Sequence, residues 1–270
     1  MRELVIYPTF LCPFSCTFCL TKNKNSYNET LTIDKIKNFL DQYSNEFDKI
    51  TISGGEPMAL KKSYFNELID TLKVYNKPII VNSYPYSLDN YREDIEYKLS
   101  YDFMARPRAL EAWNNLLSFK KPFDLTILIS PIIFKYHPND ILKRLSVLPN
   151  IKSVEFIPYC KNESSEYDIT KNDCLNKFNQ ILLQSKLNLP YKIINKEKMR
   201  AYVIEKPNED ISLCLLPDGN IYYQDFDKRN ILKFIKTDES IFNEHKTVQF
   251  PEEIDLYSDK MIQWFKDNAI

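Results

Sequence analysis

The fold is constrained most strongly by an alternation of short apolar segments with amphipathic segments between residues 4 and 183. The apolar segments have the length and β-branched content of strands that are buried on both faces. They are residues 4–7, 50–52, 79–81, 101–104, 125–129 and 154–157. Because strands that alternate with helices pair in parallel, this order predicts an α/β fold with a parallel sheet.

Helices are predicted between these strands wherever apolar residues recur at intervals of three and four. One begins after Thr32, whose hydroxyl suits a helix N-cap, and carries Ile36 and Phe39 on one side. The others span residues 65–72, 108–117, 138–145 and 173–183, while residues 88–99 fit neither pattern clearly. Six β/α units are too few for the eight-unit barrel, which takes about 250 residues. The pattern leaves two folds open, a six-unit partial barrel and an open doubly wound sheet.

The alternation stops after residue 190, and a hairpin pattern follows it. Two apolar runs, residues 211–216 and 221–226, flank the turn sequence Pro217-Asp218-Gly219-Asn220. We therefore expect a first domain over residues 1–190 and a small α+β capping module over residues 191–270.

Charge and hydropathy exclude several classes of partner. Lys and Arg number 36 against 37 Asp and Glu, so we expect no nucleic acid partner, tRNA included. No apolar stretch reaches the roughly 18 to 20 residues of a membrane helix, and the first residues enter a strand-like run instead of a signal peptide. We expect a cytoplasmic protein with no membrane partner. Six cysteines in such a chain favour metal or redox chemistry over a disulfide framework.

Three of the cysteines follow the first predicted strand in a C-x3-C-x2-C pattern formed by Cys12, Cys16 and Cys19. Soft thiolates so closely spaced suit zinc or an iron-sulfur cluster. Structural zinc needs four ligands, yet no His precedes His137 and no fourth Cys precedes Cys160. A [4Fe-4S] cluster held by three cysteines leaves one iron open for a cofactor or substrate, which favours an enzyme. Zinc and buried free thiols remain as alternatives.

Two of the three glycines in the chain stand together in Ser53-Gly54-Gly55-Glu56-Pro57, directly after the second predicted strand. Glycine is used where the backbone needs a positive φ or a close approach to another group. An ordinary turn between strand and helix is the simpler alternative.

These two motifs resemble those of the radical S-adenosylmethionine (SAM) superfamily, whose hallmark is C-x3-C-x2-C with an aromatic residue, here Phe18, before the third cysteine. The resemblance implies a partial (β/α)6 barrel and a [4Fe-4S] cluster on Cys12, Cys16 and Cys19. It implies that SAM binds the fourth iron, with Phe18 near the adenine. Gly54, Gly55 and Glu56 match the Gly-Gly-Glu-Pro motif, which contacts the methionyl amino group of SAM.

Further contacts are expected at the carboxyl ends of the later strands, where β/α barrels place their active sites. The polar residues there are Asn82, Arg106, Ser130 and Tyr159, each of which also suits a loop or a helix cap. We select Ser130 as the ribose or carboxylate contact by its position. Cys160 is a candidate hydrogen-atom donor to a substrate radical, as cysteines are in some peptide epimerases of the superfamily.

The hairpin near residue 214 resembles the SPASM and Twitch modules of radical SAM enzymes, which often hold auxiliary clusters. The chain departs from that pattern because Tyr223, Gln224 and Asp225 stand where a cysteine usually follows. Cys160, Cys174 and Cys214 are the residues left to hold such a cluster. For Cys174 and Cys214 burial as small apolar residues is the simpler expectation.

The resemblance implies an enzyme that cleaves SAM reductively to a 5′-deoxyadenosyl radical, which abstracts a substrate hydrogen atom. The electron comes from an external donor such as flavodoxin or ferredoxin. The SPASM-like ending favours a ribosomally made peptide as the substrate, and a small metabolite or carbohydrate is the alternative. A non-catalytic module that binds zinc or an iron-sulfur cluster is the alternative of another class.

Overall fold

The computed structural model describes residues 2–19, 21, 29–159, 169–185, 188–194, 212–226 and 232–237. The chain divides into two compact units, Met1–Thr237 and Asp238–Ile270. The second unit lies outside the described residues, so the architecture given below is that of the first.

One sheet organises the first unit. In its described part the strands follow each other across the sheet in the order β10-β9-β8-β1-β2-β3-β4-β5-β6-β7. Neighbours from β8 through β1 to β7 are parallel, while β9 pairs antiparallel with both β8 and β10. The strands are β1 (Glu3–Ile6), β2 (Lys49–Ile52), β3 (Ile79–Ser83), β4 (Glu96–Ser100), β5 (Phe123–Ile129), β6 (Ile151–Pro158), β7 (Lys192–Ile193), β8 (Ser212–Leu215), β9 (Ile221–Phe226) and β10 (Leu232–Lys236). The expected α/β partial barrel is confirmed.

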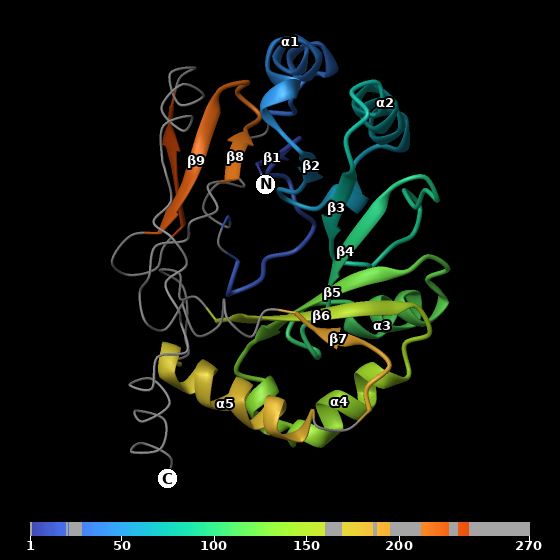
Figure 1. Cartoon of the computed structure of the whole chain (residues 1–270), viewed down its shortest axis with the longest axis vertical. Helices are drawn as coiled ribbons and strands as arrows, with labels where there is room; N and C mark the ends of the chain where they lie inside the picture. Colours follow the sequence, from blue (N-terminus) through green and yellow to red (C-terminus); the bar gives the residue numbers. More distant parts are fainter. Residues whose placement is uncertain are drawn as a thin grey trace. The chain divides into compact units, whose positions relative to one another are not determined.

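The helices lie along one side of this curved sheet (Figure 1). They are α1 (Ile33–Tyr43), α2 (Lys62–Lys73), α3 (Ala109–Ser118), α4 (Pro138–Ser146) and α5 (Lys171–Gln184), with short 3-10 helices η2 (Ser44–Glu46), η3 (Pro57–Ala59) and η4 (Ile133–Lys135). Thr32 caps α1 as predicted, because its hydroxyl accepts a hydrogen bond from the Lys35 amide. Thr170 and Asp173 form a reciprocal capping box on α5. All five predicted helices are confirmed.

The two faces of the sheet differ in polarity. Phe156 of β6 packs on Phe178 of α5, and Tyr97 of β4 packs on Phe119 at the end of α3. Successive side chains of a strand point to opposite faces, so Lys98 and Glu155 point away from these helices, and they form an ion pair. We call this side the inner face. It carries charged and polar groups in the middle of parallel strands.

The fourth predicted strand was wrong. Residues 101–104 were expected to form it, but β4 is Glu96–Ser100, inside the segment that fitted neither pattern. Tyr97 and Leu99 are buried against the helices, whereas Lys98 and Ser100 face inward, so the strand lacks a continuous apolar run. Residues 101–104 instead form a turn in which Phe103 and Met104 have positive φ.

The predicted hairpin is present as β8 and β9, and it extends the sheet. β8 pairs in parallel with β1, so that Leu215 lies beside Ile6. Val5, Tyr7, Phe10, Cys214 and Leu216 form one buried cluster, against which Tyr222 and Phe234 pack. The division of the chain at residue 190 and the SPASM-like character of its ending stay predictions.

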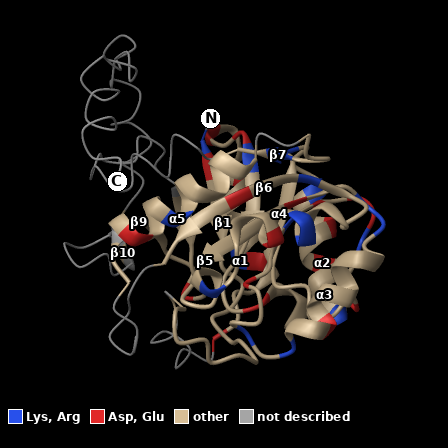
Figure 2. Cartoon of the chain, turned by 90° about the horizontal axis from the view of Figure 1, so that it is seen from below, with Lys and Arg blue, Asp and Glu red and all other residues tan. Residues whose placement is uncertain are grey.

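Charged residues of both signs are distributed over the helices and loops (Figure 2). None of the helices in the described part of the chain combines the length and the apolar composition required to cross a bilayer.

Candidate cofactor site

The loop that follows β1 carries all three cysteines of the C-x3-C-x2-C motif. Cys12, Cys16 and Cys19 are each half-buried, and the Cys19 amide donates to the Cys16 carbonyl oxygen at 3.2 Å, which closes a turn. Behind them Thr9 forms a β-bridge with Thr30. We call residues 10–19 the cysteine loop.

Phe14 anchors this loop to the segment after β3. Its buried ring meets Tyr84 and Tyr86 edge-on, with ring centroids 5.4 and 4.9 Å apart. Edge-to-face pairs of this kind are worth about 0.5–1.5 kcal/mol beyond the area they bury. Phe14 thus anchors the loop at a position between Cys12 and Cys16.

The glycine pair after β2 lies directly against the cysteine loop. The Gly55 amide donates to the Thr9 carbonyl oxygen at 2.9 Å, and the Glu56 amide donates to that of Leu11 at 3.2 Å. A Cβ atom on Gly54, whose φ is +123°, would lie 2.5 Å from the Thr9 oxygen, and one on Gly55 would lie 1.9 Å from the Leu11 oxygen. A close approach was expected here, and the partners are the backbone of Thr9 and that of Leu11 in the cysteine loop. Contact of these glycines with SAM stays a prediction.

Glu56 is a buried carboxylate, with only 4% of its surface exposed. Its Oε1 accepts hydrogen bonds from the Met58 amide at 3.0 Å and from the Ser83 hydroxyl, and its Oε2 accepts one from the Tyr84 amide at 3.1 Å. Burial raises the pKa of Glu56 to about 7 despite these donors. A carboxylate has about four acceptor positions, so Oε2 keeps one for a further donor.

Burial also raises the pKa values of two of the cysteines. The pKa of Cys16 rises to about 11, and that of Cys12 rises as well. The guanidinium of Arg106 opposes both shifts. Without a metal these two thiols therefore stay protonated at neutral pH, and binding a metal there releases protons.

The three thiols on one loop provide soft sulfur ligands, the donor type of an iron-sulfur cluster. Within the described residues, no three His, Cys, Asp or Glu side chains are grouped closely enough to hold one metal ion. The three thiols nevertheless lie within electrostatic reach of one another. The thiolates of a cluster bind different iron atoms, so they stand further apart than the ligands of one ion.

Arg106 is the residue of this site that sequence reasoning did not single out, since it was named only as one of four polar residues near strand ends. Its side chain pairs with the buried Asp102 and lies over two rings, 5.3 Å from the centroid of Phe18 and 4.9 Å from that of Tyr84. Phe18 is itself buried, and it stands between Cys16 and Cys19 in the sequence. A fixed cation thus stands beside the cysteine loop.

Three other polar residues named from the sequence lie at strand ends, where they were expected. Ser130 follows β5 and Tyr159 follows β6; both are buried, and their hydroxyl groups have no hydrogen-bond partner within the described part of the chain. The same holds for Oδ1 of Asn82 in β3. Buried polar groups without partners are rare, and a bound polar ligand is one way to satisfy them. The role of Ser130 as a ribose or carboxylate contact stays a prediction.

The remaining cysteines do not form a second site in the described residues. Cys174 is buried on α5, where its Sγ lies 3.9 Å from the Ile129 carbonyl oxygen. Cys214 is buried in β8 beside Val5, and β1 to β4 separate β8 from β5. Cys160 lies outside the described residues, so its role as a hydrogen donor stays a prediction.

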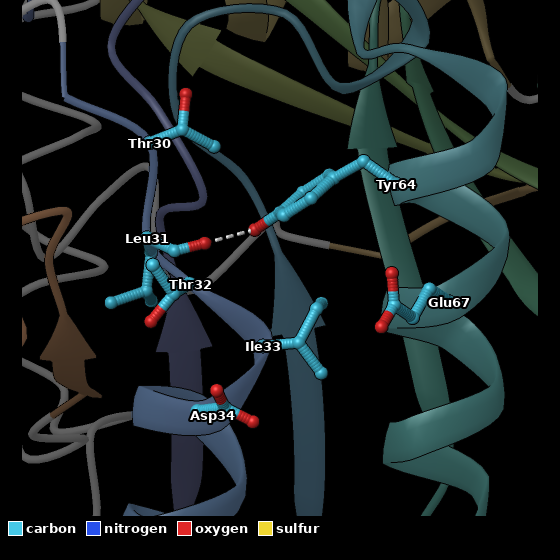
Figure 3. A pocket seen from close by; sticks show the side chains of 7 residues that line it. All are labelled: Thr30, Leu31, Thr32, Ile33, Asp34, Tyr64 and Glu67. Atoms are coloured by element: carbon cyan, nitrogen blue, oxygen red, sulfur yellow. Dashed lines mark hydrogen bonds between the residues drawn. The ribbon is translucent and has the colours of Figure 1, made fainter.

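A surface hollow of about 360 Å³ lies between the start of α1 and α2, and Figure 3 shows Thr30, Leu31, Thr32, Ile33, Asp34, Tyr64 and Glu67 around it. Tyr64 donates to the Leu31 carbonyl oxygen across it at 2.5 Å. Its only ionisable lining groups are acidic or phenolic, and it contains none of the cysteines.

Comparison with known proteins gives a family match for part of the chain and solved structures with the same fold. Residues 6–106 match the family model of the radical SAM superfamily. No curated protein matches the chain. Among solved structures, Streptococcus suis SuiB bound to precursor peptide SuiA superposes with a TM-score of 0.58 at 16% identity, over 81% of this chain and 58% of SuiB. SuiB bound to SAM gives 0.59 at 16% identity, over 81% and 59%.

A second enzyme, described as native anSMEcpe with bound AdoMet and Cp18Cys peptide, gives a TM-score of 0.61 at 15% identity over 82% of this chain and 73% of its own. The chain spans just under three fifths of the length of SuiB. Identities this low establish the shared fold. Members of the superfamily use a [4Fe-4S] cluster and SAM. Residues 6–106 thus match the radical SAM superfamily, and the chain shares the fold of radical SAM enzymes.

Proposed function

We propose that the chain is a radical SAM enzyme whose [4Fe-4S] cluster is held by Cys12, Cys16 and Cys19. The observation that carries this proposal is the pairing of the cysteine loop with Gly54-Gly55-Glu56, which joins both motifs into one rigid unit. The cluster and SAM together supply a 5′-deoxyadenosyl radical, which abstracts a hydrogen atom from the substrate.

In this proposal the residues of the chain bind and orient the cluster and SAM. Three thiolates hold the cluster and leave one iron for SAM. Glu56, buried and with one acceptor position left, suits the ammonium group of SAM, because a cation there relieves the cost of a buried charge. Phe18 offers a ring to the adenine, and Ser130 offers to the ribose or the carboxylate a hydroxyl that has no partner among the described residues. Such fixed groups place the reacting carbon and exclude water.

The substrate we propose is a ribosomally made peptide. Two of the structures that share this fold contain a peptide. The inner face of the sheet carries polar groups that suit a peptide backbone, among them Asn82, Lys98 and Glu155. Lys98 and Asn82 lie side by side because they are partners in the register of β3 and β4.

An external one-electron donor such as flavodoxin or ferredoxin completes the proposed system. Thiolate-held clusters and reduced cysteines suit a reducing compartment, so we assign the chain to the cytoplasm.

The first test is anaerobic reconstitution with iron and sulfide, followed by dithionite and SAM. We expect the wild type to bind close to four irons per chain and to form 5′-deoxyadenosine, as measured by chromatography. A triple variant with Cys12→Ala, Cys16→Ala and Cys19→Ala should do neither. The matched control is Cys174→Ala, which removes a buried cysteine on α5, outside the cysteine loop, and should keep the cluster. A colourless wild type that binds zinc would overturn the proposal.

The substrate is tested separately with the active enzyme. Pooled precursor peptides and pooled carbohydrates are incubated with SAM, and 5′-deoxyadenosine above the background is measured together with the mass of each candidate. Stimulation by a peptide, with a change in that peptide, is the expected outcome. Stimulation by a carbohydrate alone would contradict the peptide assignment and leave the radical chemistry standing.

A further inference from the structure

The turn after β4 has an unusual backbone. Phe103, Met104 and Arg108 have φ values of 45°, 74° and 59°, in the left-handed region that is unfavourable for residues with a Cβ atom. The rest of the described chain holds one other such residue that is not glycine, Asn76. Strain concentrated in one turn is retained only where the surroundings impose it, and it is typical of functional sites.

Three contacts hold this turn in place. The Asp102 carboxylate accepts a hydrogen bond from the Leu128 amide at 3.2 Å, and its carbonyl oxygen accepts one from the Ala105 amide at 2.9 Å. The Tyr84 hydroxyl donates to the Pro107 carbonyl oxygen at 3.2 Å. The ring of Phe103 is buried. The turn is therefore pinned on both sides of Arg106.

The result of this geometry is a guanidinium aimed at the cysteine loop. Arg106 lies over the rings of Phe18 and Tyr84, and its charge is paired with Asp102, whose side chain is 1% exposed. The ion pair and the two rings offset the cost of burying the charge. A purely structural ion pair would not need to lie over a ring of the cysteine motif.

The charge of Arg106 is felt at the thiols. It opposes the rise in the pKa of Cys16 that burial causes. The guanidinium lies over the ring of Phe18, which stands between Cys16 and Cys19 in the sequence, so a positive charge stands next to the loop.

We propose that Arg106 raises the reduction potential of the centre held by Cys12, Cys16 and Cys19, an inference that rests on the proposed function. One-electron reduction adds a negative charge to the cluster, and a nearby cation favours the more negative state. Arg106 thus acts as a tuning residue for the electron that starts the reaction.

The test is a potentiometric titration of the reconstituted cluster without SAM, followed by electron paramagnetic resonance. Arg106→Met removes the charge and keeps a side chain of similar length. We therefore expect the equilibrium constant for reduction to fall at least about tenfold, which lowers the reduction potential by about 59 mV. Arg106→Lys keeps the charge and should stay within half of that shift. The matched control is Arg108→Met, which removes an exposed charge two residues away and should leave the potential unchanged.

Iron content and the spectrum of the reduced cluster are measured first for every variant. Arg106→Gln repeats the charge removal in case the methionine variant does not assemble a cluster. Equal potentials in the wild type and in a charge-free variant that holds its cluster would overturn the inference and leave the proposed function intact. A wild type without any cluster would overturn both. A structural role alone would lower the cluster content without changing the potential.

Discussion

At Gly55 two backbone segments approach so closely that no side chain fits between them. We expect Gly55→Ala to lose about 3–5 kcal/mol of unfolding free energy, since its Cβ would lie 1.9 Å from a carbonyl oxygen and one segment must move. The measurement is urea unfolding of the cluster-free protein, followed by iron content after reconstitution, which should fall as well.

Gly219→Ala is the control for the alanine substitution. Gly219 also has a positive φ, of 85°, but a Cβ there meets the flexible side chain of Lys35. We expect a cost of about 1–2 kcal/mol, the usual penalty of a left-handed residue. Equal losses in the two variants would mean that the approach to Leu11 is not what requires glycine.

Glu56 gives the cluster-free protein a distinct pH dependence. The folded pKa of about 7 exceeds the unfolded value near 4.5, so the folded state binds more protons between these values. Stability present below pH 4.5 is therefore lost as the pH rises towards 7, by about 3 kcal/mol at about 1.36 kcal/mol per pKa unit. Urea unfolding at pH 5 and pH 8 measures this loss.

Glu56→Gln should flatten that dependence because the amide does not ionise. Glu111→Gln is the matched control, since Glu111 is an exposed carboxylate paired with Arg108, and it should leave the slope unchanged. A slope that persists in Glu56→Gln would assign the pH dependence to another group.

The parts of the candidate site that could be read from the sequence are those encoded locally. The cysteine spacing and the glycine pair are short motifs, and the structure brings them together through hydrogen bonds that follow from the parallel pairing of β1 with β2. Arg106 could not be found this way. Its position depends on a turn with three left-handed residues and on Asp102, and no periodic pattern predicts such a turn.

Among the elements, strands were predicted where they are apolar on both faces, and β4 was missed because it is not. Its inward residues Lys98 and Ser100 break the apolar run that a buried parallel strand normally shows. Charge on that face is tolerated because Lys98 forms an ion pair with Glu155, which lies two strands away on β6. A partner so distant in sequence cannot be inferred from the strand itself.

The predicted hairpin contains β8, which pairs in parallel with β1 and so extends the sheet. Leu215 is fully buried, and it lies beside Ile6 of β1. We expect Leu215→Ala to destabilise the partial barrel by about 2–5 kcal/mol, as for other large-to-small changes in a core. Urea unfolding followed by Trp113 fluorescence measures this, in a Trp264→Phe background so that Trp113 alone reports.

Trp113 belongs to α3 and packs on Tyr101, so its signal follows the first unit of the chain. Leu183→Ala, at an exposed position of α5, is the control and should change stability by less than about 0.5 kcal/mol. If Leu215→Ala left the Trp113 transition where it was, β8 would belong to a module that folds by itself.

On the scale of the whole molecule, the two ends of the sheet affect how a polymeric substrate could reach the inner face. β7 and β10 are the ends of the sheet in the described part of the protein. A closed ring of strands admits a polymer only by threading one terminus through it. An open sheet leaves a gap between its end strands, and a polymer can enter through that gap sideways while both of its termini stay outside. For the peptide substrate proposed above, the described sheet therefore requires no free terminus, and the modified residue can lie in the middle of the peptide.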